Sequence, residues 1–247
     1  MTFDVLILAP DFEIATHLWY PWLTEVLGPK LINLGIPTTY LLKDMVTQDY
    51  VFQTIQRENP KLIAGVGHGN VDVYTGHLYN VIWQASSYPD WTVQNRNFCP
   101  VSCLVGQKLL PDMVKKGLGA GLGEDIEYAF WYSNANDPLH DPILALFTNS
   151  EFVYEIQLAM GDTSEIAYEK MKKAYYDAAK NTYPHIADTL ISDADHRLLF
   201  GNPDWKLKEV PPSPPPPSPK QKITLDGYLN VFGYKFPIHL EGEAIQE

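Results

Sequence analysis

The sequence predicts an α/β protein built on a mostly parallel sheet. Three short apolar runs, at residues 4–9, 38–42 and 61–66, have the length and composition of buried strands. Between them, residues 13–33 and 47–57 carry apolar side chains at helical spacing. Strand, helix, strand, helix, strand is the pattern of parallel strands joined by right-handed crossovers, and this order predicts the fold class.

The later elements follow the same logic. Pro21 and the pair Gly28-Pro29 should break or kink the first helix. Residues 70–97 show little periodicity, so we expect mostly loop there, with a short strand at 79–83. The elements expected beyond this loop are a strand at 97–103, a crossover helix at 106–116, a glycine-rich strand at 117–123, and helices at 141–158, 163–182 (with Thr163 as N-cap) and 185–199.

A proline-rich stretch divides the chain near its end. Residues 210–220 contain VPPSPPPPSP, which predicts an extended polyproline linker. Residues 221–247 alternate like a pair of strands, with a turn expected at Asp226-Gly227 or at Phe232-Gly233. We therefore expect a main domain at 1–209, a linker, and a small strand pair. Three alternatives stay open for this pair: it packs on the main domain, it pairs with another subunit, or it begins a further module.

The composition of the chain argues against some binding partners and indicates a cellular compartment. A net charge of −12 argues against nucleic acid, because phosphate binding needs clustered Lys and Arg. No apolar run is long enough to cross a membrane, and the amino terminus lacks the pattern of a signal peptide. The two cysteines, Cys99 and Cys103, are too close in sequence to join distant parts of a fold, and free thiols favour a reducing compartment. We expect a cytoplasmic protein.

Two apolar runs end on reactive side chains followed by glycine. The run KLIAGV leads to His68 and Gly69, and the run FCPV leads to Cys103, with Gly106 after it. Both lie at the carboxyl ends of predicted strands, where parallel sheets place their functional residues. A thiol beside an imidazole predicts nucleophilic attack on a carbonyl, with the helix after Cys103 expected to lower the pKa of the thiol. Cys99 lies further inside the strand and is expected to be core.

Other readings of these residues are weaker. A zinc site from Cys99, Cys103, His68 and His77 would need ligand spacing that structural zinc sites rarely use. The stretch GLGAGLG fails the spacing of a dinucleotide-binding loop. No motif indicates a metal or other cofactor, so none is expected; calcium is left open without a motif for it.

The residues at the strand ends resemble those of the gingipain-type cysteine peptidases, in the group that includes caspases, legumains and clostripain. The resemblance rests on VGHG at 66–69, VSCLVG at 101–106, the opening ILAPDF, and the closing RLLFGNPDWKL at 197–207, in which Asn202 stands where the family usually has Asp. It spans about residues 3–207.

The resemblance implies a caspase-like three-layer α/β sandwich at residues 1–209 and an endopeptidase that works through a cysteinyl acyl-enzyme. Cys103 would be the nucleophile, His68 the acid and base, and the amides of Gly69 and Cys103 the oxyanion hole. The pocket for the side chain before the cleaved bond would have Val66 and Val101 as walls. Its base would select Arg or Lys through a carboxylate, with Asp11, Glu124, Asp125 and Glu127 as candidates and Trp131 as a further wall.

Two alternatives to a peptidase stay open on the sequence. The first is an inactive binding or scaffold module of the same fold, which would form homo-oligomers through residues 221–247. The second is a different thiol hydrolase or transferase that uses the same nucleophile.

Overall fold

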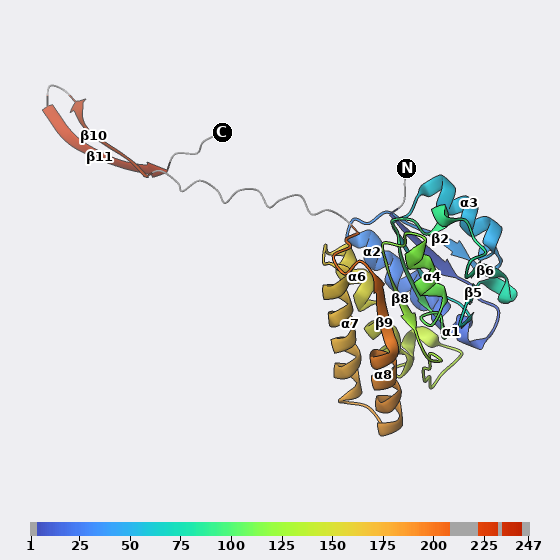
Figure 1. Ribbon diagram of the computed structural model, residues 1–247. Helices are drawn as coiled ribbons and strands as arrows, with labels where there is room; N and C mark the ends of the chain where they lie inside the picture. Colours follow the sequence, from blue (N-terminus) through green and yellow to red (C-terminus); the bar gives the residue numbers. More distant parts are fainter. Residues whose placement is uncertain (1–3, 208–221, 232–233, 244–247) are drawn as a thin grey trace. The chain divides into compact units, whose positions relative to one another are not determined.

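The computed structural model describes residues 4–207 and the backbone of residues 222–231 and 234–243. The chain divides into two compact units, Met1–Glu209 and Val210–Glu247. The first contains a six-stranded sheet in the order β2-β1-β3-β7-β8-β9 (Figure 1). Neighbouring strands are parallel, except that β9 runs antiparallel to β8. This confirms the predicted α/β class with a mostly parallel sheet. The strands are β1 (Val5–Ala9), β2 (Thr38–Leu42), β3 (Leu62–Val66), β7 (Asn97–Val101), β8 (Ala120–Glu124) and β9 (Arg197–Gly201).

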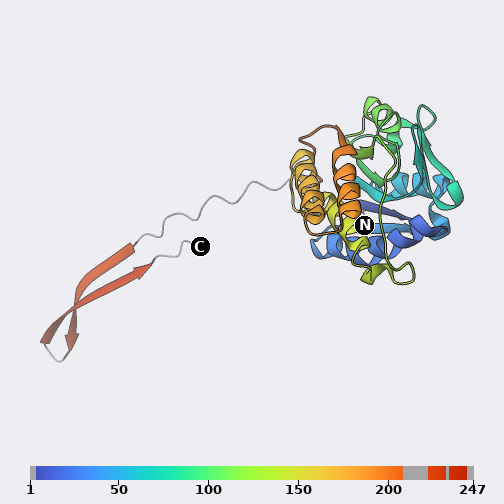
Figure 2. The same ribbon diagram turned by 90° about the horizontal axis from the view of Figure 1, so that it is seen from below.

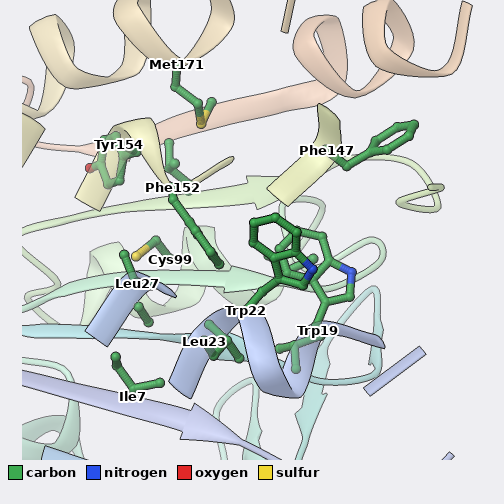
Figure 3. Close-up of a cluster of buried hydrophobic side chains, with 14 of the residues drawn as sticks. Ile7, Trp19, Trp22, Leu23, Leu27, Cys99, Phe147, Phe152, Tyr154 and Met171 are labelled. Atoms are coloured by element: carbon green, nitrogen blue, oxygen red, sulfur yellow. The ribbon is translucent and has the colours of Figure 1, made fainter. Parts of the chain in front are cut away.

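Side chains from both faces of the sheet are buried, which is why its strands are apolar throughout. Ile7 of β1 packs into one core cluster, and its neighbour Leu6 packs into a second on the opposite face. The first cluster includes the side chains of Trp19, Trp22 and Cys99 (Figure 3). The first cluster also contains side chains from helices α1 (Ile14–Pro21), α2 (Gly28–Asn33), α5 (Leu144–Glu151), α6 (Val153–Ala159), α7 (Ser164–Ala179) and α8 (Pro184–His196). The second cluster contains side chains from α3 (Gln48–Glu58) and α4 (Leu109–Lys115).

The two helical layers enclose the sheet, and α7 and α8 lie side by side in both views (Figures 1 and 2). Thr163 caps α7 by accepting a hydrogen bond from the amide of Ile166, as the sequence predicts. Within the part of the chain that the structure describes, no helix combines the length and the apolar content needed to cross a membrane.

Of the break or kink predicted for the first helix, the break does not occur. The helical path continues from α1 through a π-helical segment, Trp22–Leu27, into α2. Pro21 lies at the junction with the π segment, where the hydrogen-bond pattern changes register and a missing N–H costs little. Pro29 lies in the first turn of α2, where prolines are tolerated.

Residues 70–97 are more ordered than predicted. They contribute to a three-stranded antiparallel sheet of β4 (Gly69–Asn70), β5 (Val73–Thr75) and β6 (Val81–Gln84). Strand β6 overlaps the short strand expected at 79–83. Strands β4 and β5 are too short to show a periodicity of two, so sequence patterning could not reveal them.

Several helix boundaries also differ from prediction. The last helix ends at His196 and the chain turns into strand β9, which pairs Leu199 with Leu122 of β8. The expected helix at 141–158 is two helices that meet at Phe152. The crossover helix α4 begins only at Leu109, well after the end of β7.

The second unit contains an antiparallel hairpin of β10 (Lys222–Val231) and β11 (Tyr234–Glu243). Asp226 and Gly227 lie inside β10, opposite His239 and Ile238, so the turn predicted there is wrong. Val231 pairs with Tyr234, which leaves the alternative turn at 232–233, outside the described residues.

Candidate active site

The carboxyl ends of β3 and β7 lie next to each other, because the two strands are adjacent and parallel with Val66 opposite Val101. The residues that follow them therefore meet at one edge of the sheet. Gly69 is in close contact with the turn after β7: a Cβ built on it would lie 2.4 Å from the Cys103 carbonyl oxygen and 2.2 Å from Ser102 Oγ. A residue other than glycine would push the two turns apart.

The ring of His68 is held by a carboxylate that the sequence did not single out. His68 Nε2 is inaccessible to solvent and lies 3.2 Å from Oε1 of Glu13, too poorly aligned for a hydrogen bond but close enough for an ion pair. Glu13 precedes α1, and its carboxylate accepts hydrogen bonds from the amides of Ala15 and Thr16 at 2.8 and 2.7 Å. The backbone of His68 is fixed as well, since its carbonyl oxygen accepts hydrogen bonds from the amide and hydroxyl of Thr75.

Two opposing effects act on the Glu13 carboxyl. Burial raises its pKa, but the hydrogen bonds from Thr16 and Ala15 outweigh burial and lower the pKa below its ordinary value. Glu13 is therefore an anion at neutral pH. Its position places a negative charge beside Nε2, which favours the imidazole tautomer that carries its proton there.

Cys103 lies in a sharp turn. The following residue, Leu104, has a φ of +61°, a left-handed conformation that is uncommon for leucine, and its amide donates to the carbonyl of Ile126 at 2.9 Å. The half-buried Cys103 thiol lies 3.8 Å from the carbonyl oxygen of Tyr128. The turn after β7 is thus tied to the chain after β8, and its left-handed residue is of the kind that clusters at functional sites.

The expectation that a helix dipole lowers the pKa of this thiol is wrong. Helix α4 begins at Leu109, six residues after Cys103, so Cys103 does not lie at the helix N-terminus. Burial raises the pKa of Cys103, and the carboxylates of Glu127 and Glu124 raise it further, although the backbone of Tyr128 opposes them. The resting cysteine is therefore a thiol, and it needs a base to become a nucleophile.

Cys99 is part of the core, on β7. Its side chain is fully buried, with Sγ 3.3 Å from Oε1 of Glu155. Burial and the nearby Glu155 carboxyl raise the pKa of this thiol well above its ordinary value. Of the two cysteines, Cys103 is the one that a substrate can reach.

The residues expected to form a pocket are either buried or already paired with a neighbouring side chain. Val66 and Val101 are almost fully buried in the core cluster of Trp19, so a lining role stays a prediction for both. Asp11 pairs with His17 Nδ1 at 3.0 Å, Asp125 with His196 Nδ1 at 2.8 Å, and Trp131 donates to Thr189 at 2.8 Å.

The other two candidate carboxylates differ sharply in exposure. Glu124 is fully buried on β8, with Oε1 3.7 Å from Nε of Arg197, so it cannot meet a substrate and its selection as a pocket base is wrong. Glu127 is exposed and acts electrostatically on Cys103. In the described part of the chain, no three His, Cys, Asp or Glu side chains gather in a way that could hold a metal ion.

We compared the sequence and the structure of the chain with those of known proteins. No protein-family model matches the sequence, and no curated protein matches it. Among solved structures, the Arg-specific cysteine proteinase gingipain R matches with a TM-score of 0.55 and 13% identity, over 82% of this chain and 46% of that one. The complex of Porphyromonas gingivalis RgpB pro- and mature domains matches with a TM-score of 0.52 and 11% identity, over 82% and 48%. The chain thus spans about half the length of each, and at these identities the likeness shows the fold alone: a caspase-like α/β sandwich similar to that of gingipain R.

Proposed function

We propose that the protein is a cysteine peptidase with Cys103 as nucleophile and His68 as acid and base. The observation that carries the proposal is the contact of Gly69 with the Cys103 backbone, which brings the thiol and imidazole segments together at the ends of adjacent strands. The caspase-like fold of a cysteine proteinase supports it.

The chemistry follows from the two ring nitrogens of His68. Because Nε2 lies against Glu13, Nδ1 is the nitrogen left to exchange a proton with Cys103. Nδ1 would take the proton from Sγ as the sulfur attacks the peptide carbonyl, and would then give it to the departing amine. The amides of Gly69 and Cys103 would stabilise the oxyanion. Water then hydrolyses the thioester with His68 as base.

Glu13 has two roles in the proposed mechanism, one structural and one electrostatic, and different substitutions separate them. It caps α1 and it faces His68. Glu13→Ser should keep the cap but remove the charge beside the ring, whereas Glu13→Gln keeps the length of the side chain without its charge. We expect both to lower kcat by roughly 10-fold or more, while the melting temperature of Glu13→Ser stays within a few degrees of wild type.

The nucleophile itself is tested with a matched pair of cysteine variants. Peptide libraries with each residue before the cleaved bond varied in turn should be hydrolysed by wild type and by Cys99→Ala, but not by Cys103→Ala or His68→Ala. An acyloxymethylketone probe should label Cys103 and spare Cys99. Labelling of both cysteines to the same extent, with no library member cleaved, would rule the proposal out.

For the side chain before the cleaved bond, we propose a basic residue. Glu127 places an exposed carboxylate where it acts on the Cys103 thiol, and the chain is acidic overall. The printed name of the structural neighbour describes Arg specificity for that protein. Glu127→Gln should therefore lower kcat/KM for Arg and Lys substrates more than for Asn substrates; an equal loss on all three would contradict this role.

A second candidate function, assembly through the carboxyl-terminal hairpin, has an observation of its own. The register of β10 and β11 pairs Leu225 with Leu240 and Leu229 with Phe236, which places apolar residues on one face of the ribbon. A two-stranded ribbon of this kind is marginal unless its apolar face is covered. We propose homo-oligomers through residues 221–247. Light scattering should then give a multiple of the single-chain mass for the full chain and the mass of one chain for a chain ending at 209, and a single-chain mass for the full chain would refute this.

A further inference from the structure

The loop between β5 and β6 presents two apolar side chains to solvent beside His68. Leu78 and Tyr79 are 69% and 59% exposed, and both have a positive φ, of 50° and 60°. The ring of Tyr79 lies 5.0 Å from that of His68 and 5.1 Å from that of Phe12, which itself lies 6.0 Å from His68. Exposed apolar groups in disfavoured backbone conformations are not what folding alone would select.

This conformation is held from both sides. The amide of Gly76 donates to the Asn80 carbonyl at 2.8 Å, and the amide of His77 donates to the Val46 carbonyl at 2.8 Å. The side chain of Asn80 accepts from the amide of Gln48 at 2.9 Å. Gly76 has no room for a side chain, since a Cβ there would lie 2.1 Å from the Val46 carbonyl oxygen. The loop is therefore anchored on both flanks, and Leu78 and Tyr79 are its projecting residues.

The position of the loop relative to His68 suggests what it contacts. In acyl transfer the imidazole passes its proton to the departing amine, so the imidazole side of the site holds the part of the substrate after the cleaved bond. The Cys103 side holds the acyl part. Tyr79 and Phe12 lie against the His68 ring, and Leu78 projects next to Tyr79 in the chain.

We infer that Leu78, Tyr79 and Phe12 form a subsite for a large apolar or aromatic residue after the cleaved bond. The inference rests on the proposed peptidase function and adds a preference on the leaving side, separate from the basic residue proposed on the acyl side. An apolar side chain would be desolvated between Leu78 and Tyr79, whereas an acidic residue would lie near Glu13 and be repelled.

The test varies only the leaving side of the substrate. Quenched fluorescent peptides share one acyl part and carry Phe, Leu, Gly or Asp immediately after the cleaved bond; the methyl ester of the same acyl part serves as a substrate whose leaving group is too small to reach the loop. Wild type should prefer Phe and Leu over Gly and Asp by about 10-fold or more in kcat/KM. Leu78→Gly and Tyr79→Gly should reduce this preference to about 3-fold or less, and should lower hydrolysis of the Phe and Leu peptides more than hydrolysis of the ester.

Two controls keep the result interpretable. Glycine relieves the positive φ, so these variants should fold at least as well as wild type; Leu78→Asn, which also tolerates that conformation, is the second variant if a glycine variant fails to fold. Tyr183→Ala removes an equally exposed aromatic side chain, 66% exposed, from the start of α8 and should change nothing.

Each outcome decides a different point. A leaving-side preference that survives in both loop variants, or a wild type with no such preference, overturns the subsite while peptide hydrolysis stands. An equal loss on the ester and on all peptides also overturns it, because the loop would then act on the acyl step. If wild type cleaves neither the peptides nor the ester, the peptidase proposal fails and the subsite fails with it.

Discussion

Replacing Asp193 by asparagine should make the protein less sensitive to rising pH. Asp193 lies on α8 and is 1% exposed. Its Oδ1 accepts one long hydrogen bond, 3.5 Å from the Ala129 amide, and its Oδ2 is buried without a partner among the described residues. The nearest cation, Arg197, already pairs with Glu151 and approaches Glu124. The buried region therefore holds more carboxyl groups than one guanidinium can neutralise.

The direction of the effect follows from where the proton is held. Burial and, to a smaller extent, the charge of Glu151 raise the pKa of Asp193 to about 8, although the Ala129 hydrogen bond and Arg197 oppose them. Between the unfolded pKa near 4 and about 8, the folded protein keeps a proton that the unfolded chain has lost. The folded state therefore loses stability as pH rises, by up to about 1.4 kcal/mol per pH unit. From pH 5 to pH 7 this amounts to about 2.7 kcal/mol, which Asp193→Asn should remove.

The assay is urea unfolding at pH 5, 6, 7 and 8, followed by tryptophan fluorescence. All six tryptophans lie at or before residue 205, so the signal reports the first unit alone. Asp177→Asn is the control: Asp177 is on the surface, and its hydrogen bonds to Lys173 and Lys180 lower its pKa to about 2, so it keeps its charge across this range. If wild type and Asp193→Asn lose stability in parallel between pH 5 and 8, Asp193 is not the buried acid that we describe.

Three further changes test the geometry of the site and of the closing segment. Gly69→Ala would force the Cys103 turn away and should cost about 1–3 kcal/mol together with most of the activity, as measured by urea unfolding and peptide hydrolysis. Asn202 accepts a hydrogen bond from the Asp204 amide at 3.0 Å, a role that Asp fills equally well, so Asn202→Asp should unfold within about 0.5 kcal/mol of wild type. Cys99→Ala should lower stability by about 1–3 kcal/mol yet leave hydrolysis unchanged, the reverse of Cys103→Ala.

The sequence predicts well those features that local patterns encode. The apolar runs of β1, β3 and β7 and the turn signals after them fix the parallel sheet, and with it the edge where His68 and Cys103 lie. Helices such as α3 and α7 show the expected periodicity. The apolar runs could not show that the helical path continues past Pro21. It continues through a π-helical segment, and the formation of that segment depends on packing of its side chains against the core.

Features that depend on distant partners were not predicted. Arg197 appeared to continue a helix, but it is drawn into strand β9 and donates to the Pro100 carbonyl at 2.7 Å and to Glu151, both remote in sequence. Glu13 is not among the site residues predicted from the sequence. A signal was present: Glu13 and Thr16 form a reciprocal capping box, which marks Glu13 as the residue at the start of the helix that follows the first strand.

The order of strands in the sheet explains why three reactive groups from distant parts of the chain meet. Strands β1, β3 and β7 are consecutive neighbours and all parallel. Glu13 follows β1, His68 follows β3, and Cys103 follows β7, so the spatial order of the strands is also the order carboxylate, imidazole, thiol. In the mechanism that we propose, Glu13 orients the imidazole before substrate arrives, and the Cys103 thiol, whose pKa burial raises, gives up its proton only as it attacks. The topology therefore accounts for the proposed proton path, because moving β3 out of its place between β1 and β7 would separate His68 from one of its proposed partners.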